Sequence, residues 1–306
     1  MTTTKLTLIA LMACTSPALA ANPVEKSATT GRAAINGVDY HYEIRGKGEP
    51  LLMLHGGLGS SDMFAPVMPL YTKTRQVIAV DLQGHGRTTL GARPIRCEAI
   101  ADDLDALLAQ LGRAQVDVMG YSFGGCVALR LAIQHPERVR RLALVSTPFA
   151  DDGWYADMRV QQKQVGAAMM PMMAETPMYK TYKAVAPKPD DFPRLLDAMG
   201  EQMRTKYDWA ADVARMKMPV MLVFGDADMI RPEHEIKFYQ LLGGGLKDAG
   251  WNRENMPKNR LAIVPDVTHY EAFATPRVAE TVLPFLNGER NPKSWADQVK
   301  AQPPRK

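Results

Sequence analysis

One serine stands between glycines in the stretch Gly120-Tyr121-Ser122-Phe123-Gly124, which fits the pattern G-x-S-x-G. This pattern is typical of a sharp strand-to-helix turn that holds a strained serine at its apex, with the hydroxyl available as a nucleophile. Five-residue patterns also arise by chance, and a turn of small residues packed against its neighbours explains the same letters. The motif alone leaves both interpretations open, so the decision depends on the elements around it.

The N-terminal segment is predicted to be a secretory signal. Lys5 precedes an apolar run from Leu6 to Ala13, and Ala18-Leu19-Ala20 forms an A-x-A site that predicts cleavage before Ala21. The apolar run is too short to span a bilayer. Residues 1–20 are therefore left out of the fold prediction.

A second interpretation of the same segment is a lipid anchor. The stretch Leu11-Met12-Ala13-Cys14 is similar to the lipobox of bacterial lipoproteins, which would leave a lipidated Cys14 at the N-terminus. Met12 departs from the small or β-branched residue usual there, so we favour the secretory signal. In either case we expect an exported protein, periplasmic or secreted.

The remaining 286 residues are close to the upper limit for one hydrophobic core, which predicts one domain with an inserted subdomain. The formal net charge is only +4, and several surplus basic residues lie in the tail 288–306, which we expect to be a solvated terminus. We therefore expect a small-molecule substrate, with no nucleic-acid partner and no stable membrane span; the oligomeric state is left open.

Two cysteines remain after the predicted signal, Cys97 and Cys126. Two are too few for a disulfide framework, although an exported compartment permits a bridge. Cys126 follows Gly124-Gly125 in an apolar stretch of helical period and is most simply a small buried residue.

Strands and helices alternate along most of the chain. A two-residue turn at Asn36-Gly37 predicts an antiparallel hairpin near the start. Six short apolar runs follow, of the kind seen in buried parallel strands: PLLMLHGG, QVIAVDL, VDVMGYS, RLALVST, PVMLVFGD and RLAIVPD. Stretches of helical period separate them. This pattern predicts an α/β fold with a doubly wound, mostly parallel sheet, formed by residues 21–148 and 217–287.

Residues 149–216 interrupt the alternation with helical, methionine-rich sequence. We expect this segment to form a helical cap over the carboxyl ends of the strands. Its methionines could line an adaptable apolar pocket or form the core of the cap, and both interpretations remain open. The candidate pocket residues are Met169, Met170 and Met173 of the cap, with Met172 and Met178 as further possibilities and Tyr121 and Tyr270 beside the expected chemistry.

Five ordered stretches are similar to those of the α/β-hydrolase family, over about residues 46–287. They are LLMLHGGLGSSDMF, AVDLQGHGRT, GYSFGG, VFGDADMIRPEH and VPDVTHYEAF, each at the end of an expected strand. One such stretch is weak, but five in this order strongly favour the family. The resemblance implies the α/β-hydrolase fold with an inserted cap.

The resemblance also implies a catalytic triad of Ser122, Asp228 and His269, in the chain order expected of this fold. Ser122 is a poor nucleophile without a base to take its proton, and His269 lies in the loop after the last strand, where it could reach the serine. The acid is the fourth residue of G-x-x-D in the family, which selects Asp228 and leaves Asp226 as a turn residue that bonds its own backbone.

The other five histidines are assigned to different roles. His55 and His85 lie in glycine-rich loops whose shape they are expected to maintain. His41 falls on the opening hairpin, and His135 and His234 fall on expected helices. No histidine spacing is typical of a zinc site, so we predict neither a metal nor a cofactor.

Acyl transfer also requires donors to a developing oxyanion. We expect one from the backbone N–H of Phe123, which follows the nucleophile at a helix N-terminus, and the other from Gly57 in the HGG loop.

A serine at this position disfavours the epoxide hydrolases and haloalkane dehalogenases of the same fold, which carry aspartate there. The prediction is a carboxylic-ester hydrolase for a small to medium, largely apolar substrate. A lactonase, a carbon–carbon bond hydrolase and a cofactor-free perhydrolase remain alternatives, because the fold does not fix the substrate. A non-catalytic ligand-binding homologue is less favoured, since the triad and the oxyanion loop carry no disabling substitution. The long connection 242–260 is interpreted as surface decoration rather than as a functional loop.

Overall fold

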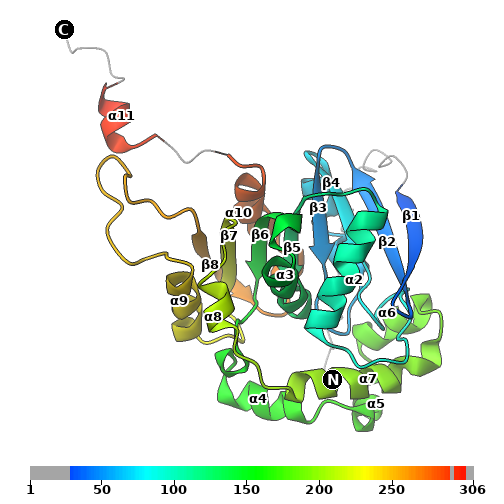
Figure 1. Cartoon of the computed structure of the whole chain (residues 1–306). Coiled ribbons are helices and arrows are strands. Elements are labelled where there is room, and N and C mark those ends of the chain that lie inside the picture. Colours follow the sequence, from blue (N-terminus) through cyan, green and yellow to red (C-terminus); the bar gives the residue numbers. More distant parts are fainter. Residues whose placement is uncertain (1–27, 290–292, 301–306) are drawn as a thin grey trace, which may run out of the picture.

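The computed structural model describes residues 28–289 and 293–300. The predicted signal, its cleavage site and Cys14 lie outside the described residues, as do positions 290–292 and 301–306 of the tail. Eight strands form a single sheet in the order β1-β2-β4-β3-β5-β6-β7-β8 (Figure 1). Their bounds are β1 Thr29–Ile35, β2 Val38–Gly46, β3 Glu49–Leu54, β4 Arg75–Val80, β5 Val116–Tyr121, β6 Val139–Val145, β7 Val220–Ala227 and β8 Arg260–Thr268.

The register of the sheet follows from the turn chemistry and from the apolar runs. β1 and β2 form an antiparallel hairpin, and Asn36 and Gly37 both take the positive φ values (48° and 79°) that such a two-residue turn requires. β2 also pairs antiparallel with β4, and the remaining neighbours pair in parallel. The predicted fold class is therefore confirmed.

The strands read as continuous apolar runs because helices cover both faces of the sheet. Alternate residues of β3 enter two different cores: Leu52 and Leu54 lie in one, and Leu51 and Met53 in the other. The first core is shared with α2 (Cys97–Gln110), α3 (Phe123–Gln134) and α9 (Pro232–Leu241). The second is shared with α1 (Met68–Thr72) and α10 (Pro276–Leu286).

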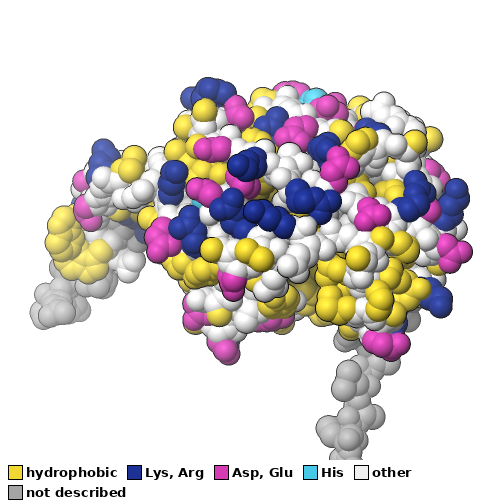
Figure 2. Space-filling view, turned by 90° about the horizontal axis from the view of Figure 1, so that it is seen from below, with side chains coloured by type: hydrophobic (Ala, Val, Ile, Leu, Met, Phe, Trp, Pro, Cys, Tyr) yellow, Lys and Arg dark blue, Asp and Glu magenta, His cyan; other side chains and the backbone are white. Residues whose placement is uncertain are grey.

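Between β6 and β7 the structure has helices and no strand. We call residues 149–216 the cap. Figure 1 shows its helices as a layer across one end of the sheet, and Figure 2 looks onto that end, where hydrophobic side chains flank a band of basic ones. The helical elements are η3 Asp151–Gly153, α4 Ala156–Lys163, η4 Ala167–Met169, α5 Met170–Met173, α6 Pro177–Val185, η5 Pro189–Asp191, α7 Phe192–Arg204 and α8 Ala210–Val213.

The amphipathic helix α7 attaches the cap to the core. Phe192, Leu195, Leu196 and Met199 recur at helical spacing and are fully buried. A Cβ placed on Gly84 would lie 3.1 Å from the Leu195 Cδ1 atom, and one on Gly57 would lie 3.0 Å from the Met199 Cε atom. Because these glycines follow β4 and β3, the cap covers the carboxyl ends of the central strands.

Short helices occupy several remaining connections: η1 Ser61–Phe64, η2 Pro136–Arg138 and η6 Ala272–Ala274. Near the C-terminus, α11 (Trp295–Lys300) projects from the body of the molecule (Figure 1), and the Trp295 ring lies 5.1 Å from that of Trp251 in the 242–260 connection. No helix in the described ranges is long and apolar enough to cross a membrane.

Candidate active site

The turn after β5 holds Ser122 in an unusual backbone conformation and needs glycine on both sides of it. Ser122 takes φ 53° and ψ −118°, values that a non-glycine residue rarely adopts. A Cβ on Gly120 would lie 2.4 Å from the Gly124 carbonyl oxygen, and one on Gly124 would lie 2.3 Å from that of His55. Backbone atoms approach positions 120 and 124 so closely that only glycine fits there. Ser122 therefore lies at the tip of a tight turn, directly before α3.

His269 reaches Ser122 from the loop after β8. Its Nε2 atom lies 3.0 Å from the Ser122 Oγ atom, and its Nδ1 atom lies 2.8 Å from the Asp228 Oδ1 atom. A carboxylate can only accept, so Nδ1 carries the proton and Nε2 is left to accept from the serine. The Trp154 ring packs edge-on against the imidazole at 5.6 Å, and the Tyr121 hydroxyl donates to the His269 carbonyl oxygen at 2.5 Å. Contacts to both its ring and its backbone therefore hold His269 in place.

Asp228 is buried, and three donors besides His269 hold it. The Ser146 hydroxyl donates to Oδ2 at 2.5 Å, the Met229 N–H donates to Oδ1 at 2.7 Å, and the Gly225 N–H donates to Oδ2 at 3.4 Å. Burial alone would raise the pKa of this carboxyl. The hydrogen bond and charge of His269, with the bond from Ser146, outweigh burial and keep the pKa below its usual value, so Asp228 is ionised at neutral pH.

Asp226 has a different role from Asp228. Its side chain is exposed, and Oδ1 accepts from the backbone N–H groups of Asp266, at 2.8 Å, and Val267, at 3.4 Å. The expectation that Asp226 bonds its own backbone was wrong: its partners belong to the neighbouring strand β8, at the register shift between β7 and β8. The structure thus brings Ser122, Asp228 and His269 together and leaves Asp226 outside the group.

The two expected oxyanion donors lie next to each other. Phe123 begins α3, so its N–H is one of the first-turn groups that have no carbonyl partner within the helix. A Cβ on Gly57 would lie 3.7 Å from the Phe123 Cβ atom. Gly57 and Phe123 are therefore close to each other in space.

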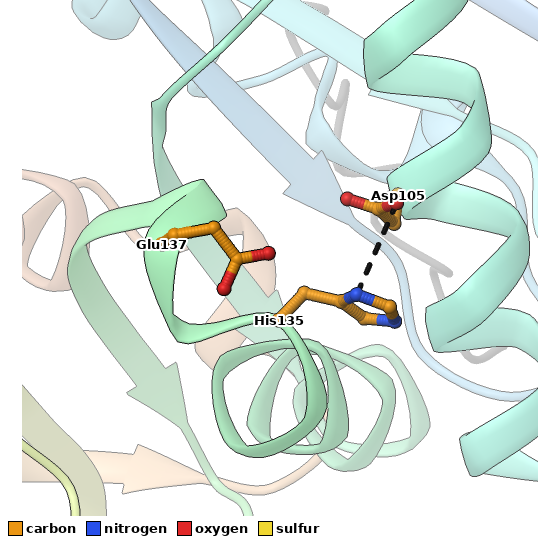
Figure 3. A group of neighbouring side chains, drawn as sticks. All are labelled: Asp105, His135 and Glu137. Carbon is orange, nitrogen blue, oxygen red and sulfur yellow. Dashed lines mark ion pairs between the residues drawn. The ribbon is translucent and has the colours of Figure 1, made fainter.

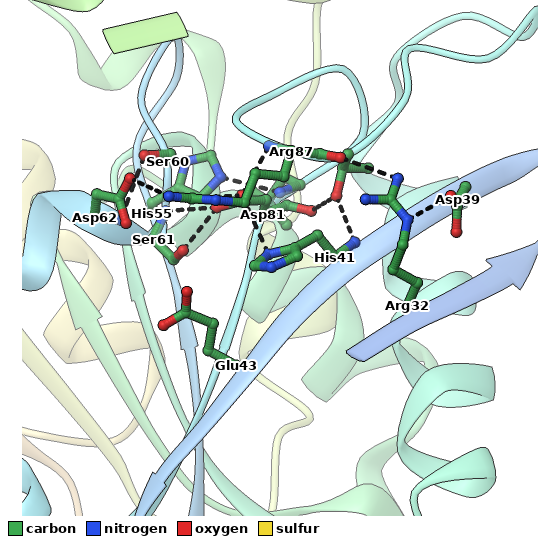
Figure 4. A network of polar contacts seen from close by, with 12 residues as sticks. Arg32, Asp39, His41, Glu43, His55, Ser60, Ser61, Asp62, Asp81 and Arg87 are labelled. Atoms are coloured by element: carbon green, nitrogen blue, oxygen red, sulfur yellow. Dashed lines mark hydrogen bonds and ion pairs between the residues drawn. The ribbon is translucent and has the colours of Figure 1, made fainter. Parts of the chain in front are cut away.

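The HGG loop is fixed by a buried polar network shown in Figure 4. His55 Nδ1 donates to the Gly56 carbonyl oxygen at 2.7 Å, while Nε2 accepts from the Leu82 N–H at 3.0 Å. Asp81 accepts from the Ser61 N–H at 2.7 Å and the Arg87 N–H at 2.8 Å. These bonds tie the loop after β3 to the loop after β4.

His55 and His85 are both buried, and neither lies in the serine–histidine–aspartate chain. Burial lowers the pKa of both rings, that of His85 to about 3, so both rings are neutral. Their contacts are those of loop supports, as expected. His41 lies in β2, His135 ends α3 and His234 lies in α9.

The expected pocket residues differ widely in how much of each side chain is exposed. Met173 is only 4% exposed and belongs to the main core, and Met169 and Met170 pack against that core partly buried. Tyr270 is 67% exposed and Met172 is 63% exposed. Tyr121, which precedes Ser122 in the chain, is buried, and its hydroxyl donates to the loop that carries His269 instead of facing a pocket.

Three residues near the site were missed by the sequence analysis. Met199 of α7 meets Gly57, Ser146 supports Asp228, and Glu235 lines the small pocket that also contains Asp228. Ser146 directly follows a buried strand and takes φ 52°, but no local pattern marks it. Glu235 is 2% exposed, and burial with the negative charges of Asp228 and Glu233 raises its pKa to about 8.

One group in the described part of the chain could hold a metal ion: Asp105, His135 and Glu137 (Figure 3). Sequence spacing could not reveal it, because Asp105 comes from α2 and the other two lie between α3 and β6. Arg138 already donates to Asp105 at 2.7 Å, and His135 pairs with Asp102 at 2.8 Å. The group precedes β6, at the opposite end of the sheet from Ser122, and takes no part in the site.

Comparison with known proteins adds an independent result. A family model described as alpha/beta hydrolase fold matches residues 49–184. The chain is 30% identical over 244 residues to a pimeloyl-[acyl-carrier protein] methyl ester esterase of Neisseria meningitidis serogroup B, covering 72% of this chain and 88% of that protein. It is 38% identical over 135 residues to a 2-hydroxymuconate semialdehyde hydrolase of a Pseudomonas strain, covering 41% of this chain and 46% of that protein, about half of its length. Among solved structures, a thermophilic esterase from Thermogutta terrifontis superimposes with a TM-score of 0.64 at 20% identity, over 86% of this chain and 98% of that one.

Proposed function

Because the chain belongs to the α/β-hydrolase fold family and is a hydrolase, we propose that it cleaves a carboxylic ester through an acyl-enzyme on Ser122. The substrate is small to medium in size and largely apolar. The observation that carries the proposal is the continuous hydrogen-bonded chain from the Ser122 hydroxyl through His269 to Asp228.

The geometry supports a specific role for each member of this chain. His269 Nε2 takes the serine proton as the Oγ atom attacks the ester carbonyl, and it returns the proton to the departing alcohol. Asp228 fixes the tautomer of His269 and stabilises the imidazolium that forms. Water then repeats the sequence on the acyl-enzyme and releases the acid.

The developing oxyanion is stabilised by backbone donors in this proposal. The N–H groups of Phe123 and Gly57 are the proposed donors, and the dipole of α3 adds partial positive charge at Phe123, its first residue. One such donor contributes about 3–4 kcal/mol to the transition state in comparable sites. The hydrogen-bond network around His55 and Asp81 holds Gly57 in position, so this donor need not be rearranged when the substrate binds.

The apolar preference rests on the residues that cover the site. Met199 of the cap packs against Gly57 in the HGG loop, and the ring of Trp154 packs against His269. The esterase of Neisseria meningitidis named above is similar to this chain over most of its length, and its name describes a methyl ester as its substrate. An ester with a small alcohol group is therefore the first substrate to test.

A panel of p-nitrophenyl esters with increasing acyl length tests the function. We expect hydrolysis of short and medium esters, together with stoichiometric labelling by a serine-reactive organophosphonate on the tryptic peptide 114–130, which contains Ser122. The Ser122→Ala variant is the matched control. Absence of both turnover and labelling in folded protein would exclude the proposal; lactone turnover that exceeds ester turnover would change the substrate class and retain the mechanism.

We further propose that the hydrolase is exported by its N-terminal segment. The supporting feature is the predicted signal in residues 1–20. N-terminal sequencing of protein recovered from the periplasm or the medium should begin at Ala21. A blocked, lipid-bearing Cys14 would indicate the lipoprotein route instead.

A further inference from the structure

The two cysteines that follow the predicted signal meet in the fold. Cys97 is the first residue of α2 and Cys126 lies in the second turn of α3, and these helices pack side by side (Figure 1). The side chains are 1% and 7% exposed, and Cys126 is near enough to Cys97 to be the main cause of the raised pKa of the Cys97 thiol. Neither thiol takes part in the proposed reaction, so their pairing needs another explanation.

The thiol pair lies where the core helices meet the cap. The Gln202 side-chain amide of α7 donates to the Cys97 sulfur at 3.6 Å, and the Tyr207 hydroxyl lies 3.9 Å from the Cys126 sulfur. The Cys126 N–H donates to the Ser122 carbonyl oxygen at 3.0 Å, so this cysteine is one helical turn from the nucleophile. A covalent bond here would fix α2 against the helix that carries the serine.

We propose that Cys97 and Cys126 form an intrachain disulfide when the chain folds in an oxidising compartment. In the balanced step, one thiolate attacks an external disulfide, such as oxidised glutathione, and displaces one thiol. The second cysteine then attacks the mixed disulfide and displaces the other thiol. Two S–H bonds are lost and one S–S bond forms, the two electrons reduce the external disulfide, and the two protons end on the released thiols.

The bond should form before the core closes. The hydrogen bond with Cys126, burial and the neighbouring negative charges raise the pKa of the Cys97 thiol well above its usual value. Since the thiolate is the reactive form, a folded and reduced chain holds little of it, and its burial also excludes an external disulfide. Oxidation is therefore expected to be fast during refolding and slow in the folded reduced protein.

The test is independent of the hydrolase function and of the export route. The full chain is refolded from denaturant in a glutathione buffer, alkylated and digested with trypsin without reduction. Cys97 and Cys126 fall in the adjacent tryptic peptides 97–113 and 114–130. We expect these peptides to appear as one linked species, two hydrogens lighter than their sum, which separates on reduction.

Three outcomes decide the proposal. The linked species supports it, and a decrease of about 5–10 °C in the melting temperature on reduction, absent in the Cys97→Ala and Cys126→Ala variants, would support the stabilising effect. Peptides 97–113 and 114–130 recovered fully alkylated after oxidative refolding would overturn it. A linkage of either cysteine to Cys14 instead would also overturn it, and the Cys14→Ser variant serves as the matched control.

Discussion

The nucleophile turn and the cap above it are held by different kinds of contact. At the turn, the backbone atoms of β3, β5 and α3 approach so closely that Gly120 and Gly124 have no space for a Cβ. The cap instead contacts the core through flexible side chains, such as Met199 against Gly57. The difference suggests that the turn tolerates almost no change in shape, whereas the cap can be repacked to suit another substrate without disturbing the reacting groups.

The largest effect is expected at the turn itself. Ser122→Ala removes the attacking oxygen but leaves the backbone and the glycines unchanged, so kcat should fall by about 10⁴ or more. The melting temperature should stay close to that of the wild type, because the hydroxyl bonds only His269 among the described residues. Steady-state ester hydrolysis and a thermal melt check both statements. Near-full activity would show that the turn is structural only.

The second prediction separates the two aspartates. Asp228→Asn replaces one acceptor oxygen by an NH2 donor and removes the negative charge, so the His269 tautomer is no longer fixed and kcat should fall by about 10³–10⁴. Asp226→Asn should lower kcat much less, because Asp226 bonds only backbone groups of β8. The comparison requires kinetics on both variants with one ester. A reversed ranking would mean that the acid has been assigned to the wrong carboxylate.

The third prediction concerns the cap. Met199→Ala should lower the free energy of unfolding by about 2–5 kcal/mol, since the side chain is fully buried. It should also shift the preferred acyl length, because Met199 meets the oxyanion loop. Met172→Ala, at a site 63% exposed on the cap surface, should change stability by less than about 0.5 kcal/mol and leave the preference unchanged. Equal effects in the two variants would contradict the contact between α7 and the loop.

The fourth prediction concerns a dependence of stability on pH at Glu235. Its pKa is raised to about 8 in the fold, so the fold favours the protonated form, and this stabilisation is complete below the ordinary pKa of 4.5 and is lost as the pH rises through about 8. The free energy of unfolding should therefore decline with pH across this window, by at most about 1.4 kcal/mol for each pH unit.

Glu235→Gln does not titrate and should lack this part of the decline. Urea unfolding at pH 5 and pH 8 measures the difference, with Glu280→Gln, at an exposed position of α10, as control. Identical slopes in the wild type and Glu235→Gln would show that Glu235 is ionised throughout.

Features encoded by neighbouring residues were predictable from the sequence. The hairpin at Asn36-Gly37 and the buried strands follow from turn chemistry and apolar runs, and both are present. The proximity of Ser122, Asp228 and His269 followed from the position of each at the end of a strand, together with the family resemblance.

Contacts that depend on tertiary packing were not predictable. Ser146 carries no motif, and its bond to Asp228 arises because β6 and β7 are neighbours in the sheet. Among the cap methionines, side-chain type did not distinguish Met173 and Met199, which both enter the core, from the exposed Met172, nor did it show that Met199 packs against Gly57. The bonds from Asp226 to the β8 backbone depend on the register shift between β7 and β8, which no local pattern in the sequence indicates.

The bond between Ser122 and His269 joins positions 147 residues apart in the chain. The base is carried by the loop after β8, the last strand to emerge during synthesis and an edge strand of the sheet. A chain that lacks β8, or has not yet docked it, contains the nucleophile but no base. Under the proposed mechanism, ester turnover requires completion of the whole sheet, and during refolding it should recover later than the formation of α2 and α3, whose contacts are more local.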